Sequence, residues 1–373
     1  MMSYRNEDFW IDVNLKNLCA NYDAVRNTVG GKKGVMAVIK ADAYGHGMAE
    51  TAKALEKHGA DYLAVSHFGE GKYLREQGIT MPVLLMTPAL PDYYEEIVSL
   101  GLMPSLDCVE NLAVLAKAAG GRRMGFHLKV NTGMNRFGLN CDQVGDFLAA
   151  LPQYPNLYLA GVFSHLPTAL LKDHPQTTAQ IKKFEAVVAK IKKEIDYDFD
   201  IHLCNSAGAI CYPDARWDYV RVGTLLYGQF PAAHLKGAME LLPTWQAKAH
   251  ILETREVEPG DTVGYGADFK VREKMRLGVI PVGYSDGFGV QPPLNNVSFK
   301  IFVKQGLKLL RSFLRKRPNH QVYYEKKPLP VIGRIAMQTT VISLNNTDAG
   351  VGDIVDIPLR RTATAPTIKK NYV

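Results

Sequence analysis

The sequence predicts an α/β protein, in which a (β/α)8 barrel of the TIM type is followed by a mostly β C-terminal domain. Two observations predict this fold class. Between about residues 12 and 235, short apolar runs rich in β-branched residues alternate with longer amphipathic stretches. Eight strand–helix units in a row are typical of a closed parallel barrel, which needs about 250 residues. After about residue 242, helical periodicity largely disappears and strand-like runs between turn signals replace it.

The barrel strands are short apolar runs, predicted in chain order at 34–39, 61–66, 81–86, 101–106, 125–130, 157–163, 200–204 and 218–222. Amphipathic helices are predicted between most of them, including 48–57, 70–77, 108–118 and 178–194. The fourth strand has the weakest pattern, and the link after the seventh is short. The same alternation is compatible with an open doubly wound sheet, which is the alternative fold.

The domains are predicted as a barrel over residues 1–242 and a β-rich domain over residues 243–373. Strands of the second domain are predicted within 244–257, 275–284, 328–337 and 339–344, separated by turn sequences such as Glu258-Pro259-Gly260-Asp261. Residues 306–317 place leucines on one side and basic residues on the other, which predicts a short basic amphipathic helix. Such a helix either binds an anionic surface or packs its apolar face on its own domain.

Composition excludes several classes of protein. With 47% hydrophobic and 22% charged residues among 373, the chain is neither disordered nor fibrous. It has no run of about 18 apolar residues, and its first residues lack an apolar h-region, so we expect neither a transmembrane helix nor a secretory signal. Five cysteines without Cys-x-x-Cys spacing predict neither a disulfide framework nor a metal site. They fit a reducing, cytoplasmic setting best. A net charge of +7 suits anionic small ligands and does not indicate nucleic acid.

Polar residues follow the predicted strands at their carboxyl ends, where barrel enzymes place their chemistry. Lys40 closes the first strand, and Tyr44 follows in the loop. A lysine at the end of an apolar strand is partly desolvated, which lowers its pKa and suits it to Schiff-base chemistry. The position is equally compatible with an ordinary surface lysine.

Four further strand ends carry compatible groups. Lys129 lies at the end of the fifth strand and Arg136 follows it, and an arginine there can hold a carboxylate through two hydrogen bonds. His165 follows the sixth strand. The seventh strand runs into residues 205–208 and the eighth ends in residues 221–224, and the small residues and backbone N–H groups there suit phosphate binding. Each signal alone is weak, and five together indicate an active site.

Seven segments form a more specific pattern: AVIKADAYGHG (37–47), HLKVNTGMNRFG (127–138), NSAG (205–208), RVGTLLYG (221–228), VGYGADF (263–269), IPVGYSDGFG (280–289) and GRIAMQ (333–338). In them, and over nearly its whole length, the chain resembles the alanine racemase family. That resemblance implies an enzyme dependent on pyridoxal 5′-phosphate (PLP) that interconverts L- and D-alanine, with D-alanine supply for a bacterial cell wall as its purpose.

The resemblance also implies two bases. Lys40 matches the PLP-binding lysine, which takes the α-proton on one face, and Tyr265 matches the base on the opposite face. Racemisation needs removal of a proton from one side and return from the other. A tyrosine has a pKa of about 10, so it can act as a base only if cationic neighbours favour its phenolate. The resemblance implies that Arg221 and His165, which match a pair on the cofactor side, are these neighbours. Without the resemblance, Tyr265 would be interpreted as a turn aromatic packed on the β domain.

Arg221 separates two kinds of PLP chemistry. An arginine facing the pyridine nitrogen can only donate a hydrogen bond, which weakens the electron sink of the cofactor. Related barrel-type decarboxylases place an acid there, so this match favours a racemase over a decarboxylase.

The remaining site residues also come from the resemblance. Positions that bind the phosphate are matched by Tyr44, Ser206, Gly223 and Thr224, and positions that line the cofactor by Leu85 and Asn205. Positions around the amino-acid substrate are matched by Arg136, the backbone of Met337 and, at the entrance, Tyr284. Lys129 matches a lysine that several members carry in carbamylated form.

Two positions depart from the family pattern. Gln338 stands where the family has an aspartate, and Pro366 falls where it has a C-terminal tyrosine that narrows the substrate pocket; Tyr372 does not fit that register. A racemase of broader or different specificity, such as one for serine, is therefore an alternative. A non-catalytic PLP-binding barrel protein is a second alternative. Such proteins typically lack the β domain and its tyrosine, so the presence of both here argues against this alternative. The resemblance finally implies a homodimer with shared active sites, each taking Lys40 from one chain and Tyr265 from the other.

Overall fold

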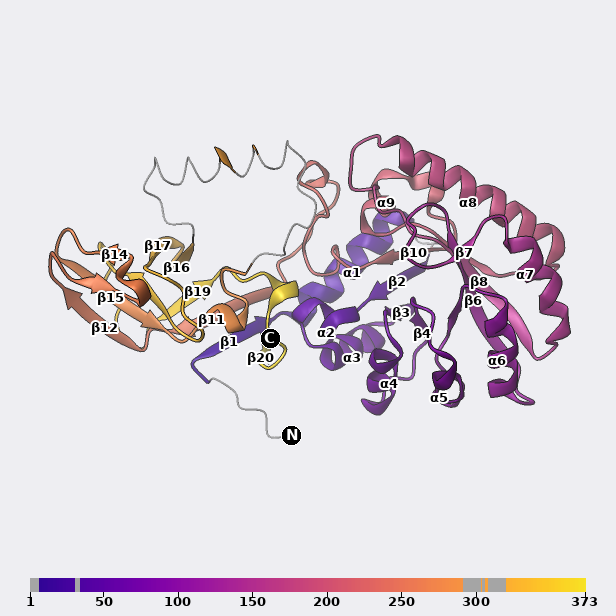
Figure 1. The fold of residues 1–373 in the computed structure, drawn as a ribbon, viewed down its shortest axis with the longest axis horizontal. Coiled ribbons are helices and arrows are strands. Elements are labelled where there is room, and N and C mark those ends of the chain that lie inside the picture. Colours follow the sequence, from indigo (N-terminus) through magenta and orange to yellow (C-terminus); the bar gives the residue numbers. More distant parts are fainter. Residues whose placement is uncertain (1–6, 31–33, 291–302, 304–305, 308–319) are drawn as a thin grey trace. The chain divides into compact units, whose positions relative to one another are not determined.

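The computed structural model describes residues 7–30, 34–290, 303, 306–307 and 320–373 (Figure 1). The chain divides into two compact units, one of residues 14–244 and one that joins residues 1–13 to residues 245–373. The boundary predicted between residues 242 and 243 stays a prediction. Apart from Gly306 and Leu307, the predicted basic helix at 306–317 lies outside the described residues. No described helix is long and apolar enough to span a membrane.

The larger unit is built around a parallel β barrel, as predicted. Its strands are, in spatial order, β4 (Val83–Leu85), β3 (Tyr62–Val65), β2 (Gly34–Val38), β10 (Tyr219–Val222), β9 (Asp200–His202), β8 (Leu157–Phe163), β6 (Met124–Asn131) and β5 (Ser105–Leu106). A parallel bridge from Leu84 to Met103, just before β5, brings the two ends of this order together. The sheet is therefore nearly closed, which excludes the open doubly wound alternative. The short strand β7 (Leu139–Asn140) pairs with β6 outside this order.

Helices alternate with the strands and cover the outside of the barrel (Figure 1). They are α1 (Leu15–Val29), α3 (Met48–His58), α4 (Phe68–Glu76), α5 (Tyr94–Ser99), α6 (Glu110–Ala119), α7 (Val144–Ala150), α8 (Pro175–Glu194) and α9 (Ser206–Cys211). In α3, Met48, Ala52 and Leu55 are buried at the spacing of one helix face, and Gly59 ends the helix in the left-handed conformation.

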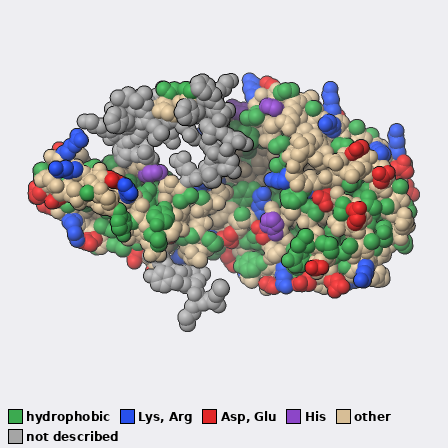
Figure 2. Space-filling view, viewed as in Figure 1, with side chains coloured by type: hydrophobic (Ala, Val, Ile, Leu, Met, Phe, Trp, Pro, Cys, Tyr) green, Lys and Arg blue, Asp and Glu red, His purple; other side chains and the backbone are tan. Residues whose placement is uncertain are grey.

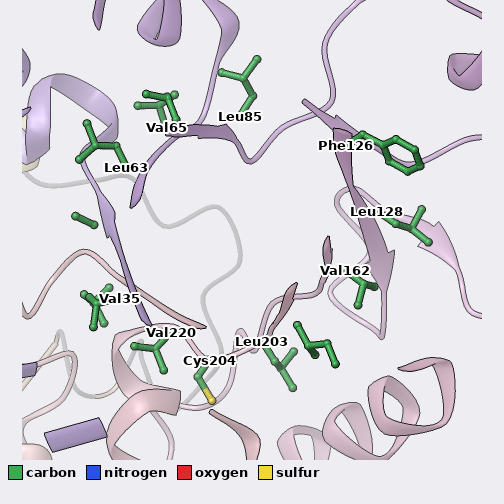
Figure 3. Close-up of a cluster of buried hydrophobic side chains, with 14 of the residues drawn as sticks. Val35, Leu63, Val65, Leu85, Phe126, Leu128, Val162, Leu203, Cys204 and Val220 are labelled. Atoms are coloured by element: carbon green, nitrogen blue, oxygen red, sulfur yellow. The ribbon is translucent and has the colours of Figure 1, made fainter. Parts of the chain in front are cut away.

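Both faces of the barrel strands are buried, which explains their near-continuous apolar sequences. Alternate residues pack outward against the helices: Val35, Leu63, Leu85 and Val220 belong to this layer (Figure 3). The residues between them, such as Met36, form a separate cluster.

The second unit consists mainly of one antiparallel sheet. Its strands are, in spatial order, β12 (Glu253–Val257), β15 (Met275–Ile280), β18 (Thr340–Ser343), β17 (Lys327–Ile332), β16 (Gln321–Tyr324), β19 (Ile354–Ile357), β11 (Trp245–His250), β1 (Phe9–Val13) and β20 (Lys369–Tyr372). A separate hairpin joins β13 (Thr262–Val263) to β14 (Phe269–Lys270). The first strand of the chain, β1, was not predicted; it pairs antiparallel with β11 and parallel with β20.

Candidate active site

A pocket of about 280 Å³ opens at the carboxyl ends of the barrel strands. It brings together ten of the residues singled out in the sequence: Lys40, Tyr44, Lys129, Arg136, His165, Asn205, Ser206, Arg221, Gly223 and Thr224. Leu85 is fully buried on β4 in the layer under the helices (Figure 3), and its neighbours Met86 and Thr87 line the pocket.

Lys40 is half-buried at the end of β2, where the sequence analysis placed it. Burial lowers the pKa of its amine, the guanidinium of Arg136 lowers it further, and the carboxylate of Glu70 partly opposes both. A neutral amine is the form that attacks a carbonyl carbon or accepts a proton. The environment of Lys40 therefore favours its reactive form.

The aromatic ring of Tyr44 closes one side of the pocket. It packs on Tyr227, with ring centroids 4.8 Å apart, and the Tyr227 hydroxyl donates to the carbonyl of Val38 at 3.0 Å. Tyr44 also lies so close to Gly223 that a Cβ on that glycine would come within 2.5 Å of the Tyr44 hydroxyl oxygen. Only a glycine at position 223 fits this arrangement without displacing Tyr44.

Two loops beside Tyr44 present small polar groups to the pocket. The Ser206 hydroxyl accepts a hydrogen bond from the Gly223 N–H at 3.1 Å, which ties the loop after β9 to the loop after β10. The side-chain oxygen Oδ1 of Asn205 accepts from the N–H groups of Ala207 and Gly208, and its side-chain nitrogen Nδ2 lies 3.5 Å from His165 Nε2.

Arg221 is a buried cation at the base of the pocket, with 4% of its surface exposed. Its guanidinium donates to the carbonyls of Ser164 and Leu203, and to both the carbonyl and the Nδ1 atom of His202, the last at 2.7 Å. None of these acceptors is charged. Three are backbone carbonyls, and the fourth, the His202 imidazole, is neutral because burial and the Arg221 charge hold its pKa well below 6.5. Burial lowers the pKa of Arg221 itself to about 10, so the charge persists at neutral pH.

A second histidine extends this chain of hydrogen bonds. Because Arg221 can only donate, His202 must accept at Nδ1 and carry its proton at Nε2. That Nε2–H then donates to His127 Nδ1, 2.7 Å away. Burial lowers the pKa of His127 to about 3, so both imidazoles are neutral. The sequence analysis did not identify His127 or His202, although two histidines inside the apolar strands GFHLKV and DIHLC were a usable signal.

The pocket carries positive charge from Arg136 and Arg221. Burial, with Arg221 and Arg136 close by, lowers the pKa of Lys129 to about 7, and the Lys129 amine donates to the Met86 carbonyl. Burial and Arg221 lower the pKa of His165 to about 3, so this imidazole is neutral at neutral pH and is not the cationic neighbour that the sequence analysis expected. None of the described residues that line the pocket is acidic. On the visible outer face of the barrel unit, by contrast, acidic and basic side chains are interspersed (Figure 2). The charge of the pocket therefore favours an anionic ligand.

Three predicted site residues lie in the β unit, and all are exposed: Tyr265 (74%), Met337 (58%) and Tyr284 (49%). Tyr265 begins the turn between β13 and β14. Arg334 forms an ion pair with Asp268, just after this turn, and its guanidinium lies against the turn, where a Cβ on Gly266 would be 3.3 Å from it. The exposure of these three side chains leaves them accessible to another molecule.

The loops of Tyr284 and Met337 are held together. The Tyr284 N–H donates to the Ala336 carbonyl at 3.0 Å, and Ser285 donates to the Met337 carbonyl through its N–H at 3.1 Å and its hydroxyl at 2.7 Å. The C-terminal segment packs on the same loop, because a Cβ on Gly287 would meet the Ala363 carbonyl oxygen at 2.3 Å. Pro366 follows three residues later.

Comparison with known proteins identifies the family. The model of the alanine racemase N-terminal domain matches residues 13–231, and the model of the C-terminal domain matches residues 244–370. The chain belongs to the alanine racemase family. This confirms the resemblance found in the seven segments.

Individual relatives extend the match over nearly the whole chain. Alanine racemase of Synechocystis sp. is 34% identical over 357 residues, which cover 93% of this chain and 88% of that protein. Alanine racemase 2 of Bacillus subtilis is 31% identical, with 92% and 83% covered. The solved structure of alanine racemase from Clostridium difficile 630 has a TM-score of 0.87 at 27% identity, and covers 99% of this chain and 96% of its own.

Proposed function

We propose that the protein is a PLP-dependent racemase that interconverts L- and D-alanine, with Lys40 and Tyr265 as its two bases. The observation that carries the proposal is a lysine with a lowered pKa at the end of β2, in a cationic pocket at the carboxyl end of a parallel barrel. Relatives 31–35% identical over most of the chain that are named alanine racemase support the choice of reaction and substrate.

The pocket fits PLP in the charge and chemistry of its lining residues. A phosphate and a substrate carboxylate are anions, which suit a pocket lined by lysines and arginines without an acid among the described lining residues. Lys40 would bind the cofactor covalently. The phosphate would be held by Tyr44, Ser206, Gly223 and Thr224, where the glycine at 223 allows the Tyr44 hydroxyl to lie against the loop after β10. Arg221, His165 and Asn205 would contact the ring.

When bound, PLP supplies an electron sink that stabilises the charge left on the α-carbon of the substrate after proton removal. Lys40 accepts or returns the proton at Nζ, helped by the environment that lowers its pKa. Arg136 and the Met337 N–H hold the substrate carboxylate and orient the α-carbon. Arg221 would donate a hydrogen bond and give up no proton, because its pKa stays at about 10 and the His202 imidazole that it contacts is neutral.

We further propose that the active form is a homodimer. Tyr265, Tyr284 and Met337 are large side chains that stay exposed on their own unit. Exposed apolar and aromatic groups in one region are typical of a protein interface. In a two-fold dimer, each site would take Lys40 from one chain and Tyr265 from the other.

Chemical reduction tests the role of Lys40. The PLP-loaded protein is treated with borohydride, which makes the attachment permanent, and then digested for peptide mapping. We expect the adduct on Lys40 and no adduct in Lys40→Arg. An adduct on Lys129, the other pocket lysine with a lowered pKa, would contradict the assignment.

Solvent exchange tests the two bases. D-alanine is incubated with the enzyme in D₂O, and the earliest L-alanine is analysed by mass spectrometry. Two bases require that the proton returned comes from a different group, so the first product carries deuterium at the α-carbon. Substantial retention of protium in that first product would indicate a single base.

A further inference from the structure

The segment that follows Lys40 has an unusual backbone. Ala41, Asp42, Ala43 and Tyr44 all have φ between 51° and 55°, which makes a short left-handed turn. None of the four is a glycine, the residue that adopts this region without steric cost. Such a turn persists only where its surroundings hold it in place, and this one begins directly after the proposed catalytic lysine.

One carboxylate holds the start of this turn. Glu70 Oε1 accepts a hydrogen bond from the Ala41 N–H at 2.7 Å. Its other oxygen, Oε2, accepts from the N–H groups of Ser66 at 2.7 Å and His67 at 3.1 Å. Glu70 lies in the first turn of α4, so it joins the loop after β2 to the loop after β3. Hydrogen bonds to an ionised acceptor are stronger than those between neutral groups.

The other anchors of the turn lie farther along it. Asp42 Oδ1 accepts from the Met48 N–H at 2.8 Å, and the ring of Tyr44 packs on Tyr227. His46 Nδ1 lies 3.1 Å from the carbonyl oxygen of Ala43. Glu70, by contrast, binds the N–H of Ala41, the residue next to Lys40.

We propose that Glu70 is a positioning residue for Lys40: its carboxylate fixes the first peptide of the left-handed turn and thereby aims the lysine side chain into the pocket. The inference rests on the proposed role of Lys40. It adds a residue of α4, outside the pocket lining, to the machinery of the reaction.

Glu70→Asp is the discriminating variant. The shorter side chain keeps the negative charge and can still cap α4 through Ser66 and His67, but it is one methylene too short to reach Ala41 as well. The charge near Lys40 is therefore preserved while the positioning contact is lost. Glu70→Ala removes both contacts, and Glu95→Gln, at an exposed glutamate in the first turn of α5, is the matched control.

Hydrogen–deuterium exchange of the PLP-loaded full-length protein is the main readout, followed on peptides that contain residues 41–48. We expect exchange at this segment to be faster by about tenfold or more in Glu70→Asp and Glu70→Ala, because an opened hydrogen bond exposes the amide to solvent. The racemisation kcat should fall by about tenfold or more in both variants, since misplacing a catalytic group by about 1 Å is costly. Glu95→Gln should match the wild type in both measurements.

Unchanged exchange in Glu70→Asp and Glu70→Ala would overturn the proposal, whatever their activity. Faster exchange with wild-type kcat would overturn it too, since the turn would then be held by Glu70 without placing Lys40. Because exchange does not depend on turnover, its outcome is separable from the proposed function: wild-type protein that fails to racemise alanine refutes the reaction, and the exchange contrast still reports on Glu70.

Discussion

Lowering the pH from 6.5 to 4.5 should destabilise the barrel unit steeply, because buried histidines cannot accept protons in the folded state. His127 and His202 are fully buried and His165 is partly buried in the pocket wall, and all three have pKa values held well below 6.5 by desolvation and by the charge of Arg221. In the unfolded chain each would bind a proton near its ordinary pKa of about 6.5. Their contribution to stability is therefore complete above pH 6.5 and is lost as the pH falls below it.

The magnitude follows from the number of protons. Each histidine that is protonated only in the unfolded state lowers the unfolding free energy by about 1.4 kcal/mol per pH unit. Asp200 acts in the opposite direction: burial and the neighbouring Asp218 raise its pKa to about 6, so the folded state binds its proton first as the pH falls. Near pH 5 the unfolded state therefore binds three extra protons, on the histidines, and the folded state binds one, on Asp200, so that unfolding takes up a net two protons. These groups give a net slope of about 2.7 kcal/mol per pH unit near pH 5.

Urea unfolding followed by circular dichroism, repeated at several pH values, measures this slope. His127→Asn and His202→Asn are the diagnostic variants, since the asparagine carbonyl can still accept the hydrogen bond made to Nδ1 but cannot titrate. Each should cost stability at neutral pH through lost packing, and each should flatten the slope between pH 6 and 4.5 by about 1.4 kcal/mol per unit. Profiles parallel to that of the wild type, or a wild-type stability that does not fall over this range, would refute the reasoning.

Three further outcomes are expected. Pro366→Tyr should lower kcat/KM for serine relative to alanine by about tenfold, because a wall near the substrate shifts discrimination by about 1–3 kcal/mol; an unchanged ratio in steady-state assays would show that Pro366 does not shape the pocket. Lys40→Ala and Tyr265→Phe should each be inactive, and refolding them together should restore roughly a quarter of wild-type activity, since half of randomly paired dimers carry one intact site; verified heterodimers without activity would exclude shared sites. Gly223→Ala should push Tyr44 aside and weaken PLP retention by about tenfold or more in equilibrium dialysis, because the added Cβ would lie 2.5 Å from the Tyr44 hydroxyl; wild-type retention would contradict the proposed phosphate site.

The barrel was predictable because each strand is buried on both faces and reads as a short apolar run. Leu157–Phe163 was predicted with its observed bounds, and the run at 34–39 ends one residue beyond β2. β1 escaped prediction because Phe9–Val13 is stabilised by pairing with β11, more than 200 residues later in the sequence, and local patterns do not record such distant partners.

The site was predictable to the level of strand ends and no further. Lys40 follows one apolar strand and Arg221 lies near the end of another, and a parallel barrel brings the carboxyl ends of its strands to one mouth. The left-handed turn after Lys40 could not be predicted, because its two alanines and its tyrosine disfavour that backbone and its single aspartate is only a weak signal for it. The partner of Arg221 was also missed: His202 contacts it only because β9 and β10 are neighbours in the barrel.

Chiral analysis of alanine tests the central claim most directly. The purified full-length protein is incubated separately with L-alanine and with D-alanine, with and without added PLP, beside Lys40→Ala. The account predicts that both reactions converge on equal amounts of the two enantiomers, which have the same free energy in water, that the rate depends on PLP, and that Lys40→Ala is inactive. Failure of the PLP-loaded wild type to form D-alanine from L-alanine, or undiminished racemisation by Lys40→Ala, would contradict it.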